Sequence, residues 1–289
     1  LAVQVTAGDG SGVSTSPQTA PVARATMTAS RQRVLGEPRY THTLKARPGR
    51  FSAPDPTVTY TWPGGDTART YEIRPGDVGT KVVLRIRAEA PGYEPLTVKV
   101  KSATVGYRID ARRTVRYHVE TRGRITTSLE EFRTQAQQTY DDPRGWRSAG
   151  IRFVPVKSGG AFTLVLAEAG YLPRFSSGCS AMWSCRVGRF VIINQDRWKN
   201  ASPAWNAAHL ALRDYRHMVV NHETGHWLGL GHAQCPGPGR LAPVMQQQSK
   251  GLQGCRFNPF PTAHEIASRT PRGRAMAYLG ARGYSPDVE

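Results

Sequence analysis

The stretch HETGHWLGLGH, residues 222–232, decides how the C-terminal part of this chain folds. Positions four apart on an α-helix share one face, so the spacing predicts a helix on which His222 and His226 reach one metal ion. Glu223 follows directly round the helix, near enough to handle a metal-bound water without being a ligand. Gly229 is expected to take the left-handed conformation that ends a helix and turns the chain back. The turn would bring His232 to the same ion.

Three protein ligands and one open position are the catalytic arrangement of zinc, whereas structural zinc sites are closed by four ligands. The alternative is that histidines on an apolar helical face are ordinary core residues. The pattern fixes five positions, and three are held by histidine, of which the chain has 8 in 289 residues. Chance agreement is about one in ten thousand. We therefore expect one catalytic zinc ion held by His222, His226 and His232, with Glu223 as the catalytic residue.

The same stretch resembles the HExxHxxGxxH signature of the metzincin zinc peptidases. Metzincins also carry a methionine in a tight turn beneath the metal, and LAPVMQ at residues 241–246 supplies Met245 for that role. Residues 235–261 are similar to the C-terminal part of snapalysin-type secreted bacterial proteinases. Two positions depart from these relatives. His232 stands where snapalysins have Asp, and Gln247 stands where astacins and serralysins have Tyr.

The resemblance implies a secreted zinc-dependent endopeptidase that hydrolyses peptide bonds with a zinc-activated water. Glu223 would be the general base and then the general acid, and the substrate would be a protein or peptide. The alternative from another class is a cell-surface binding or adhesion protein that uses Ig-like modules and carries a catalytically inert metzincin scaffold. The intact ligands and the intact Glu223 favour the enzyme.

The chain is expected to be multidomain, with an all-β Ig-like sandwich over residues 24–105. The runs TVTYTW (57–62) and KVVLRIR (81–87) alternate apolar and polar residues between Pro and Gly turns. Trp62 is a candidate core anchor between two sheets. The pattern resembles the Ig-like repeats of bacterial surface proteins, which are spacers or adhesive units.

Residues 1–23 contain a possible remnant of a second such module. LAVQVTA (1–7) matches VVLRIRA (82–88) in apolar register, which predicts the last two strands of a preceding Ig-like repeat. The alternative is a disordered leader rich in Ser, Thr and Gly. The chain begins at Leu1 without an initiator Met or a basic-then-apolar leader, so we expect a mature or trimmed product. If the repeat interpretation holds, we expect the native protein to be longer at its N-terminus.

Residues 106–289 are expected to form the α+β metzincin-type domain, with a mixed twisted sheet, an active-site helix and an irregular C-terminal part. Strands are predicted at 115–120, 151–156, 162–166 and 190–194. The resemblance to metzincins implies an antiparallel edge strand that binds substrate within 178–187. An amphipathic helix should follow Ser128. The motif helix is expected at roughly 210–229, and a final helix near 263–279, interrupted at Pro271.

The four cysteines indicate the compartment. They pair naturally as Cys179 with Cys185 and Cys235 with Cys255, although three connectivities are possible. Disulfides form in oxidising compartments, so we expect a secreted, extracellular or cell-surface protein. No run of 18 apolar residues predicts a membrane span.

The net charge of +18 and the pI near 10.4 raise the question of an anionic partner. Arginine is scattered along the chain without a basic block or interleaved aromatic residues. We interpret the charge first as a solvated Arg-rich surface, then as attraction to an anionic cell-wall or surface polymer. A nucleic-acid partner is the weakest interpretation. We expect a monomer.

Other polar residues are less informative. His217 lies about 140° round the helix from His222, which predicts a surface residue and not a ligand. We expect the same of His118, His209 and His264, which have no partner spacing. Calcium is possible at three aspartates, but no DxDxDG-type loop supports it. These aspartates are Asp141, Asp142 and Asp196.

Overall fold

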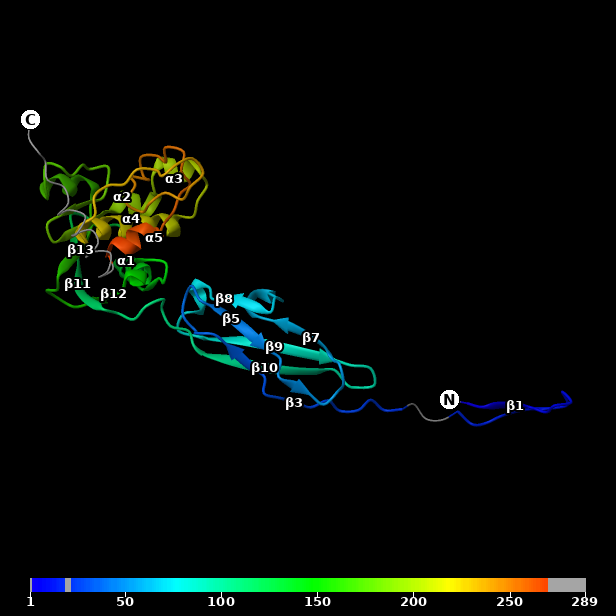
Figure 1. Cartoon of the computed structure of the whole chain (residues 1–289). Coiled ribbons are helices and arrows are strands. Elements are labelled where there is room, and N and C mark those ends of the chain that lie inside the picture. The colour runs from blue at the N-terminus through cyan, green and yellow to red at the C-terminus, as the bar shows by residue number, and fades with distance from the viewer. Residues whose placement is uncertain (1, 19–21, 270–289) are drawn as a thin grey trace, which may run out of the picture. The chain divides into compact units, whose positions relative to one another are not determined.

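The computed structural model describes residues 2–18 and 22–269, and its contacts divide the chain into two compact units (Figure 1). Unit one comprises residues 1–38, 42–73 and 79–105, and unit two comprises residues 39–41, 74–78 and 106–289.

Unit one is built almost entirely from short antiparallel strands. They are β1 (Gln4–Thr6), β2 (Val13–Thr15), β3 (Ala29–Ser30), β4 (Arg33–Leu35), β5 (Thr43–Arg47), β6 (Arg50–Phe51), β7 (Thr57–Thr61), β8 (Thr70–Glu72), β9 (Lys81–Glu89) and β10 (Leu96–Thr104), with the 3-10 turn η1 (Pro63–Gly65). The strands β10-β9-β7 form one sheet and β4-β5-β8 form another, while β3 pairs with β6.

The core of unit one is formed by apolar side chains that alternate along the strands with exposed residues. In β9, Val82, Leu84 and Ile86 are buried, and the residues between them face outward. Trp62, directly after β7, stacks on Tyr71 of β8 with ring centroids 5.3 Å apart, and both rings are buried. The two three-stranded sheets therefore share one aromatic contact, and Trp62 lies in the core where the sequence expects it.

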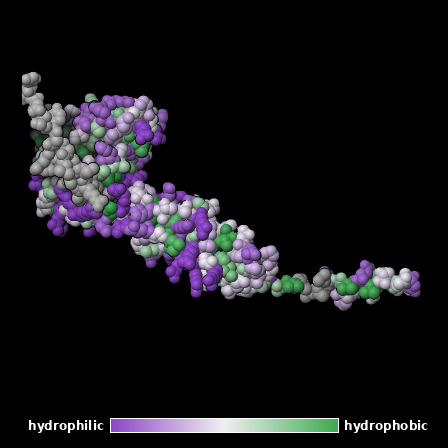
Figure 2. All heavy atoms as spheres, viewed as in Figure 1, coloured by the Kyte–Doolittle hydropathy of each residue, from purple (hydrophilic) through white to green (hydrophobic). Residues whose placement is uncertain are grey.

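The N-terminal strands β1 and β2 form a separate two-stranded hairpin. Every residue of both strands is exposed, including Val5 and Val13, which keep 62% and 56% of their surface in solvent, and Val3 before β1 keeps 63%. Figure 2 shows hydrophobic residues on the surface of the N-terminal hairpin. That two strands form here agrees with the repeat interpretation of residues 1–23, which stays a prediction.

Unit two contains a five-stranded sheet and the longest helices of the described chain. Its strands are β11 (Arg113–Arg122), β12 (Ile151–Pro155), β13 (Phe162–Ala167), β14 (Cys185–Val187) and β15 (Phe190–Asn194). Its helices are α1 (Leu129–Asp141), α2 (Gln195–Asn200), α3 (Pro203–Ala207), α4 (Leu212–Trp227) and α5 (Ala263–Arg269), with the 3-10 turns η2 (Pro75–Asp77), η3 (Trp146–Ala149) and η4 (Ala169–Arg174).

The sheet of unit two has the order β12-β11-β13-β15-β14. Its first four strands run parallel, and β14 pairs antiparallel to β15 at the edge. All six residues of β13 are buried, as expected for a strand that is covered on both faces. The helices α1 and α4 contribute Phe132, Tyr140 and Val219 to the core on one face. Leu172 of η4 and Cys179 pack on the other.

Several boundaries differ from the sequence prediction. The motif helix α4 is shorter than 210–229, and the short helices α2 and α3 were not predicted. Asn194 caps α2 by accepting the N–H groups of Asp196 and Arg197, and Ser202 caps α3. The final helix is described only as α5, and the expected interruption at Pro271 lies outside the described residues. In the described ranges, no helix is both long and apolar enough to cross a membrane.

Candidate metal centre

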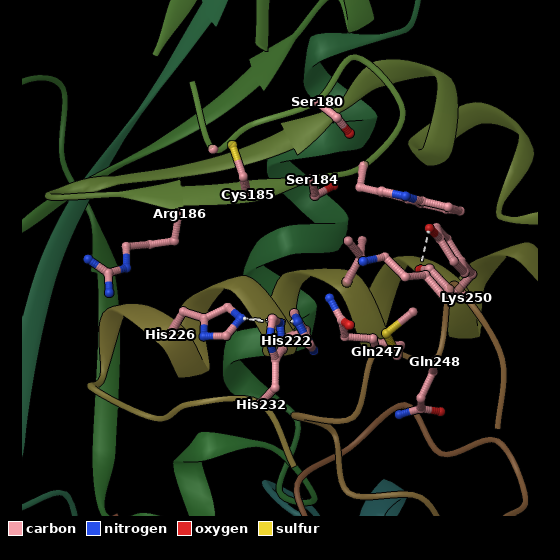
Figure 3. A pocket seen from close by; sticks show the side chains of 16 residues that line it. Ser180, Ser184, Cys185, Arg186, His222, His226, His232, Gln247, Gln248 and Lys250 are labelled. Atoms are coloured by element: carbon pink, nitrogen blue, oxygen red, sulfur yellow. Dashed lines mark hydrogen bonds between the residues drawn. The ribbon is translucent and has the colours of Figure 1, made fainter. Parts of the chain in front are cut away.

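Three histidine side chains converge at the end of α4 (Figure 3). The Nε2 atom of His226 lies 3.2 Å from the Nε2 atom of His222 and 3.2 Å from that of His232. The structure therefore brings together all three ligands that the sequence proposes. Within the described residues, no other group of His, Cys, Asp and Glu side chains is arranged to hold a metal ion.

The end of α4 explains how His232 returns to the helix. Gly229 has a φ of +90°, in the left-handed region that favours glycine. Its N–H donates to the carbonyl of His226 over 3.0 Å, and the N–H of Leu230 donates to the carbonyl of Gly225 over 3.0 Å. This pair of hydrogen bonds is the Schellman motif, which stops a helix and reverses the chain.

The hydrogen bonds of the rings fix which nitrogen faces the centre. Nδ1 of His222 is 2.8 Å from the carbonyl oxygen of Val244, and Nδ1 of His226 is 2.9 Å from that of Leu230. A carbonyl only accepts, so both Nδ1 atoms must carry the proton. The Nε2 lone pairs of these rings then point at each other, an arrangement that a shared cation stabilises.

The spacing also fits zinc. A tetrahedral zinc ion about 2.0 to 2.1 Å from each imidazole nitrogen would hold pairs of nitrogens about 3.3 Å apart. Burial lowers the pKa of His222 to about 3 and lowers the pKa of His226 and His232 as well. All three rings are therefore neutral near pH 7, which is the protonation state that binds a metal.

Glu223 is buried beside the ligands, with 5% of its surface exposed. Burial raises the pKa of its carboxyl to about 8, against a smaller opposing effect of Arg186. Its carboxylate has no hydrogen-bond partner among the described side chains and backbone groups. A carboxyl group with a raised pKa and no fixed partner is suited to accept and return a proton.

Met245 packs against α4 at Gly225, between His222 and His226 in the sequence. It is 1% exposed, and its carbonyl accepts the N–H of Ala233, the residue after His232. A β-carbon placed on Gly225 would lie 2.3 Å from the Met245 sulfur. Glycine at 225 therefore allows the methionine to approach the helix between the first two histidines.

Glu265 on α5 is a buried residue of this centre that sequence reasoning missed. Its carboxylate accepts the N–H groups of Val244 and Met245 over 3.1 and 2.9 Å, and also the N–H and hydroxyl of Thr262. The peptide group between Val244 and Met245 thus donates to Glu265 and accepts from His222. A sequence signal existed in Thr262, which precedes Glu265 by three residues at the start of a helix.

A cavity of about 440 Å³ opens in front of the three histidines. Ser184 and the edge strand β14, through Cys185 and Arg186, line one side, and the loop after Met245 lines another (Figure 3). Among the described residues, β14 is paired along one edge, where β15 is its neighbour in the sheet. The other edge leaves backbone groups available to an extended chain.

Two disulfides brace the surroundings. Cys179 is bonded to Cys185 at the start of β14, and Cys235 is bonded to Cys255 across the loop that carries Met245. This is the pairing that the sequence favours, and none of the four cysteines is free. Both bonds are consistent with an extracellular protein.

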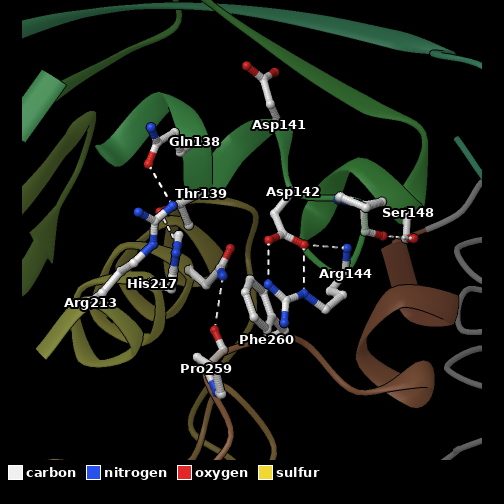
Figure 4. Close-up of polar contacts among 12 residues, drawn as sticks. Gln138, Thr139, Asp141, Asp142, Arg144, Ser148, Arg213, His217, Pro259 and Phe260 are labelled. Carbon is white, nitrogen blue, oxygen red and sulfur yellow. Dashed lines mark hydrogen bonds and ion pairs between the residues drawn. The ribbon is translucent and has the colours of Figure 1, made fainter. Parts of the chain in front are cut away.

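The expectation that His217 is a surface residue was wrong. His217 is 3% exposed, and its Nδ1 contacts the Thr139 hydroxyl at 2.8 Å (Figure 4). Its ring packs 5.4 Å from that of Phe260, because α1 and the C-terminal segment cover the side of α4 that points away from the metal ligands. His118 is also buried, bonded to Glu120. His209 and His264 are exposed as expected.

The calcium candidates are not brought together. The Asp142 carboxylate is bound by the guanidinium of Arg144 through two hydrogen bonds of 2.9 and 2.7 Å (Figure 4). Asp141 accepts from Gln137 instead. Asp196 belongs to the first turn of α2, where the macrodipole favours an acid.

Comparisons with known proteins identify the family but not an activity. No curated protein matches the chain. The family described as protein of unknown function (DUF3152) matches residues 96–268, which extend from β10 into α5 and include the three histidines, Glu223 and Met245. Because the match covers more than half of the sequence, the chain belongs to the DUF3152 family.

Proposed function

We propose that this protein is a secreted zinc-dependent endopeptidase. The observation that carries the proposal is the convergence of three imidazole nitrogens at the end of a helix on which the buried Glu223 directly follows His222. The open cavity in front of them and the unpaired edge of β14 give a peptide access to the same place.

The three histidines would hold one zinc ion through their Nε2 atoms. When bound, such an ion supplies Lewis acidity, which lowers the pKa of a water and polarises a carbonyl group. Glu223 would take the proton of the attacking water and deliver it to the leaving amine. Its lack of a competing hydrogen bond leaves the carboxylate free to serve both roles.

The edge strand β14 would hold the substrate. An extended peptide that adds to β14 gains main-chain hydrogen bonds irrespective of its side chains. Because Arg186 on β14 and His226 on α4 line one cavity, such a peptide would pass in front of the histidines. Binding of this kind positions the scissile carbonyl and reduces the entropic part of the barrier.

The position of Met245 supports a metzincin-type assignment within this proposal. It is buried and packs on the motif helix at Gly225, which is compatible with the role of a Met-turn residue. The two disulfides support an oxidising, extracellular location.

The proposal is tested by metal content and chelation. The purified protein should contain close to one zinc per chain and should cleave an unstructured protein such as casein. A chelator should stop the cleavage, and added zinc should restore it. A metal-free protein that cleaves casein equally well would contradict the proposal, and so would a zinc-loaded protein that cleaves no peptide.

A second candidate function is binding to an anionic surface polymer through unit one. On its outer faces Arg33 lies directly opposite Arg47, and Arg85 lies directly opposite Lys99, all four exposed. Like charges directly opposite in a sheet are destabilising, and a bound polyanion would offset that cost. An inert, zinc-loaded protein that sediments with anionic cell walls in low salt only would favour this function. Changing the four residues to Gln should then release it.

A further inference from the structure

The cavity beside the histidines carries positive charge at both ends. Lys250 lines one end, and Arg186 on β14 lines the other. No Asp or Glu is found among its described lining residues. The Lys250 side chain runs from the loop after Met245 back toward the histidines (Figure 3).

The backbone around Lys250 is held firmly although its side chain is exposed. The neighbouring Gln248 is fully buried, donates to the carbonyls of Pro243 and Asn258, and accepts the N–H of Asn258 over 2.8 Å. Ser249 bonds the hydroxyl of Tyr215 over 3.0 Å. The loop therefore presents Lys250 from a fixed place, which reduces the entropy cost of binding through it.

The Lys250 ammonium has neither a hydrogen bond nor an ion pair to any side chain in the described ranges. Of the polar groups near it, Gln248 binds backbone and Tyr215 binds Ser249, while the Gln247 amide is exposed and uncharged. A substrate side chain that enters this end of the cavity thus meets one unpaired cation and apolar walls from Met218 and Val219. Such surroundings favour a carboxylate over a neutral or positive group.

We propose, on the basis of the peptidase function above, that Lys250 makes this site selective for substrates with Asp or Glu adjoining the cleaved bond. The aliphatic stem of a Glu side chain would lie along Met218 and Val219, and its carboxylate would pair with the ammonium. Lys250 is then a specificity-determining residue that takes no part in the bond cleavage.

Matched peptides that differ only by Glu or Gln beside the scissile bond test the charge alone. Wild-type protein should cleave the Glu peptide with a kcat/KM about tenfold higher, as expected for a charge-assisted pair. Lys250→Gln should bring the two rates together, and Lys250→Glu should favour a Lys peptide. Lys157→Gln, which removes a lysine lining a separate cavity, should leave the preference unchanged.

A second measurement needs no turnover. Binding of the same peptides to the zinc-loaded Glu223→Gln variant, measured by calorimetry, should show the Glu preference and its loss when Lys250→Gln is added. Equal affinities, or a preference that survives Lys250→Gln, would overturn the inference. Retained Glu preference in binding without cleavage of any peptide by wild type would overturn the peptidase function alone.

Discussion

The sulfur of Met245 occupies the space that a side chain on Gly225 would need. A β-carbon there would lie 2.3 Å from the sulfur and 3.0 Å from Cζ2 of Trp146. The space beside Gly225, which lies between His222 and His226 in the sequence, is therefore filled by Met245, twenty positions later in the chain. The motif helix and the turn that carries Met245 pack closely against each other at this contact.

Gly225→Ala should destabilise the protein despite the helix propensity of alanine. Alanine gains about 1 kcal/mol over glycine in a helix, but overpacking of a filled core costs about 1 to 3 kcal/mol. With a 2.3 Å contact we expect the clash to win by about 1 kcal/mol in chemical denaturation. Gly231→Ala is the control, because a β-carbon there meets nothing within 4 Å. Equal stability of the two variants would contradict the packing argument.

Glu265→Gln should weaken both the fold and the metal centre. The carboxylate accepts three backbone N–H groups and a hydroxyl, and an amide presents NH₂ to some of these donors. We expect a loss of about 2 kcal/mol in unfolding free energy. Because the Val244–Met245 peptide also holds His222, zinc affinity should fall about tenfold. Competition with a zinc indicator measures that affinity.

Glu130→Gln is the matched control for Glu265→Gln, since Glu130 is an exposed acid near the start of α1. It should change zinc affinity by less than the error of the titration. A Glu265→Gln protein that keeps wild-type zinc affinity would show that the hydrogen bonds of Glu265 to the Val244–Met245 segment do not position His222 for zinc binding.

His217 should make stability depend on pH below neutrality. Burial lowers its pKa in the folded protein below the ordinary 6.5, so the unfolded chain binds the proton more readily. The free energy of unfolding should therefore fall as the pH drops below 6.5 toward the pKa of His217 in the folded protein. Above pH 6.5, His217 should not change the free energy of unfolding.

The comparison of wild type with His217→Asn isolates this effect. The Thr139 hydroxyl donates to the carbonyl of Gln135, so it accepts from Nδ1 of His217, and the Asn amide can replace that donor. The stability difference between the two proteins should shift in favour of the variant as the pH falls from 7 to 5. Since the site histidines are common to both, a constant difference over this range would refute the assignment.

The local features of the site were predictable from the sequence. The helical period predicts that His222 and His226 share one face of the helix. The preference for glycine after the last turn predicts that the helix ends at Gly229. Strands β12, β13 and β15 were found within about a residue because they are apolar runs between turn residues.

Features that depend on the packed structure were not predictable in this way. The residues of α4 from Tyr215 to Gly225 are all buried, so the angle of His217 round the helix could not reveal its burial. Glu265 acts on His222 through a peptide group that lies between them only in the folded chain.

The start of α3, in contrast, could have been predicted from the sequence, because Ser202 followed by Pro203 is a pair that commonly starts a helix.

The most direct test of the central claim is the activity of Glu223→Ala with its zinc content measured on the same sample. The three histidines are unchanged in this variant, so it should retain about one zinc per chain. It should lose at least about a hundredfold in cleavage of casein and of a broad peptide library, because general acid–base catalysis contributes that much. Full activity in zinc-loaded Glu223→Ala would contradict the account.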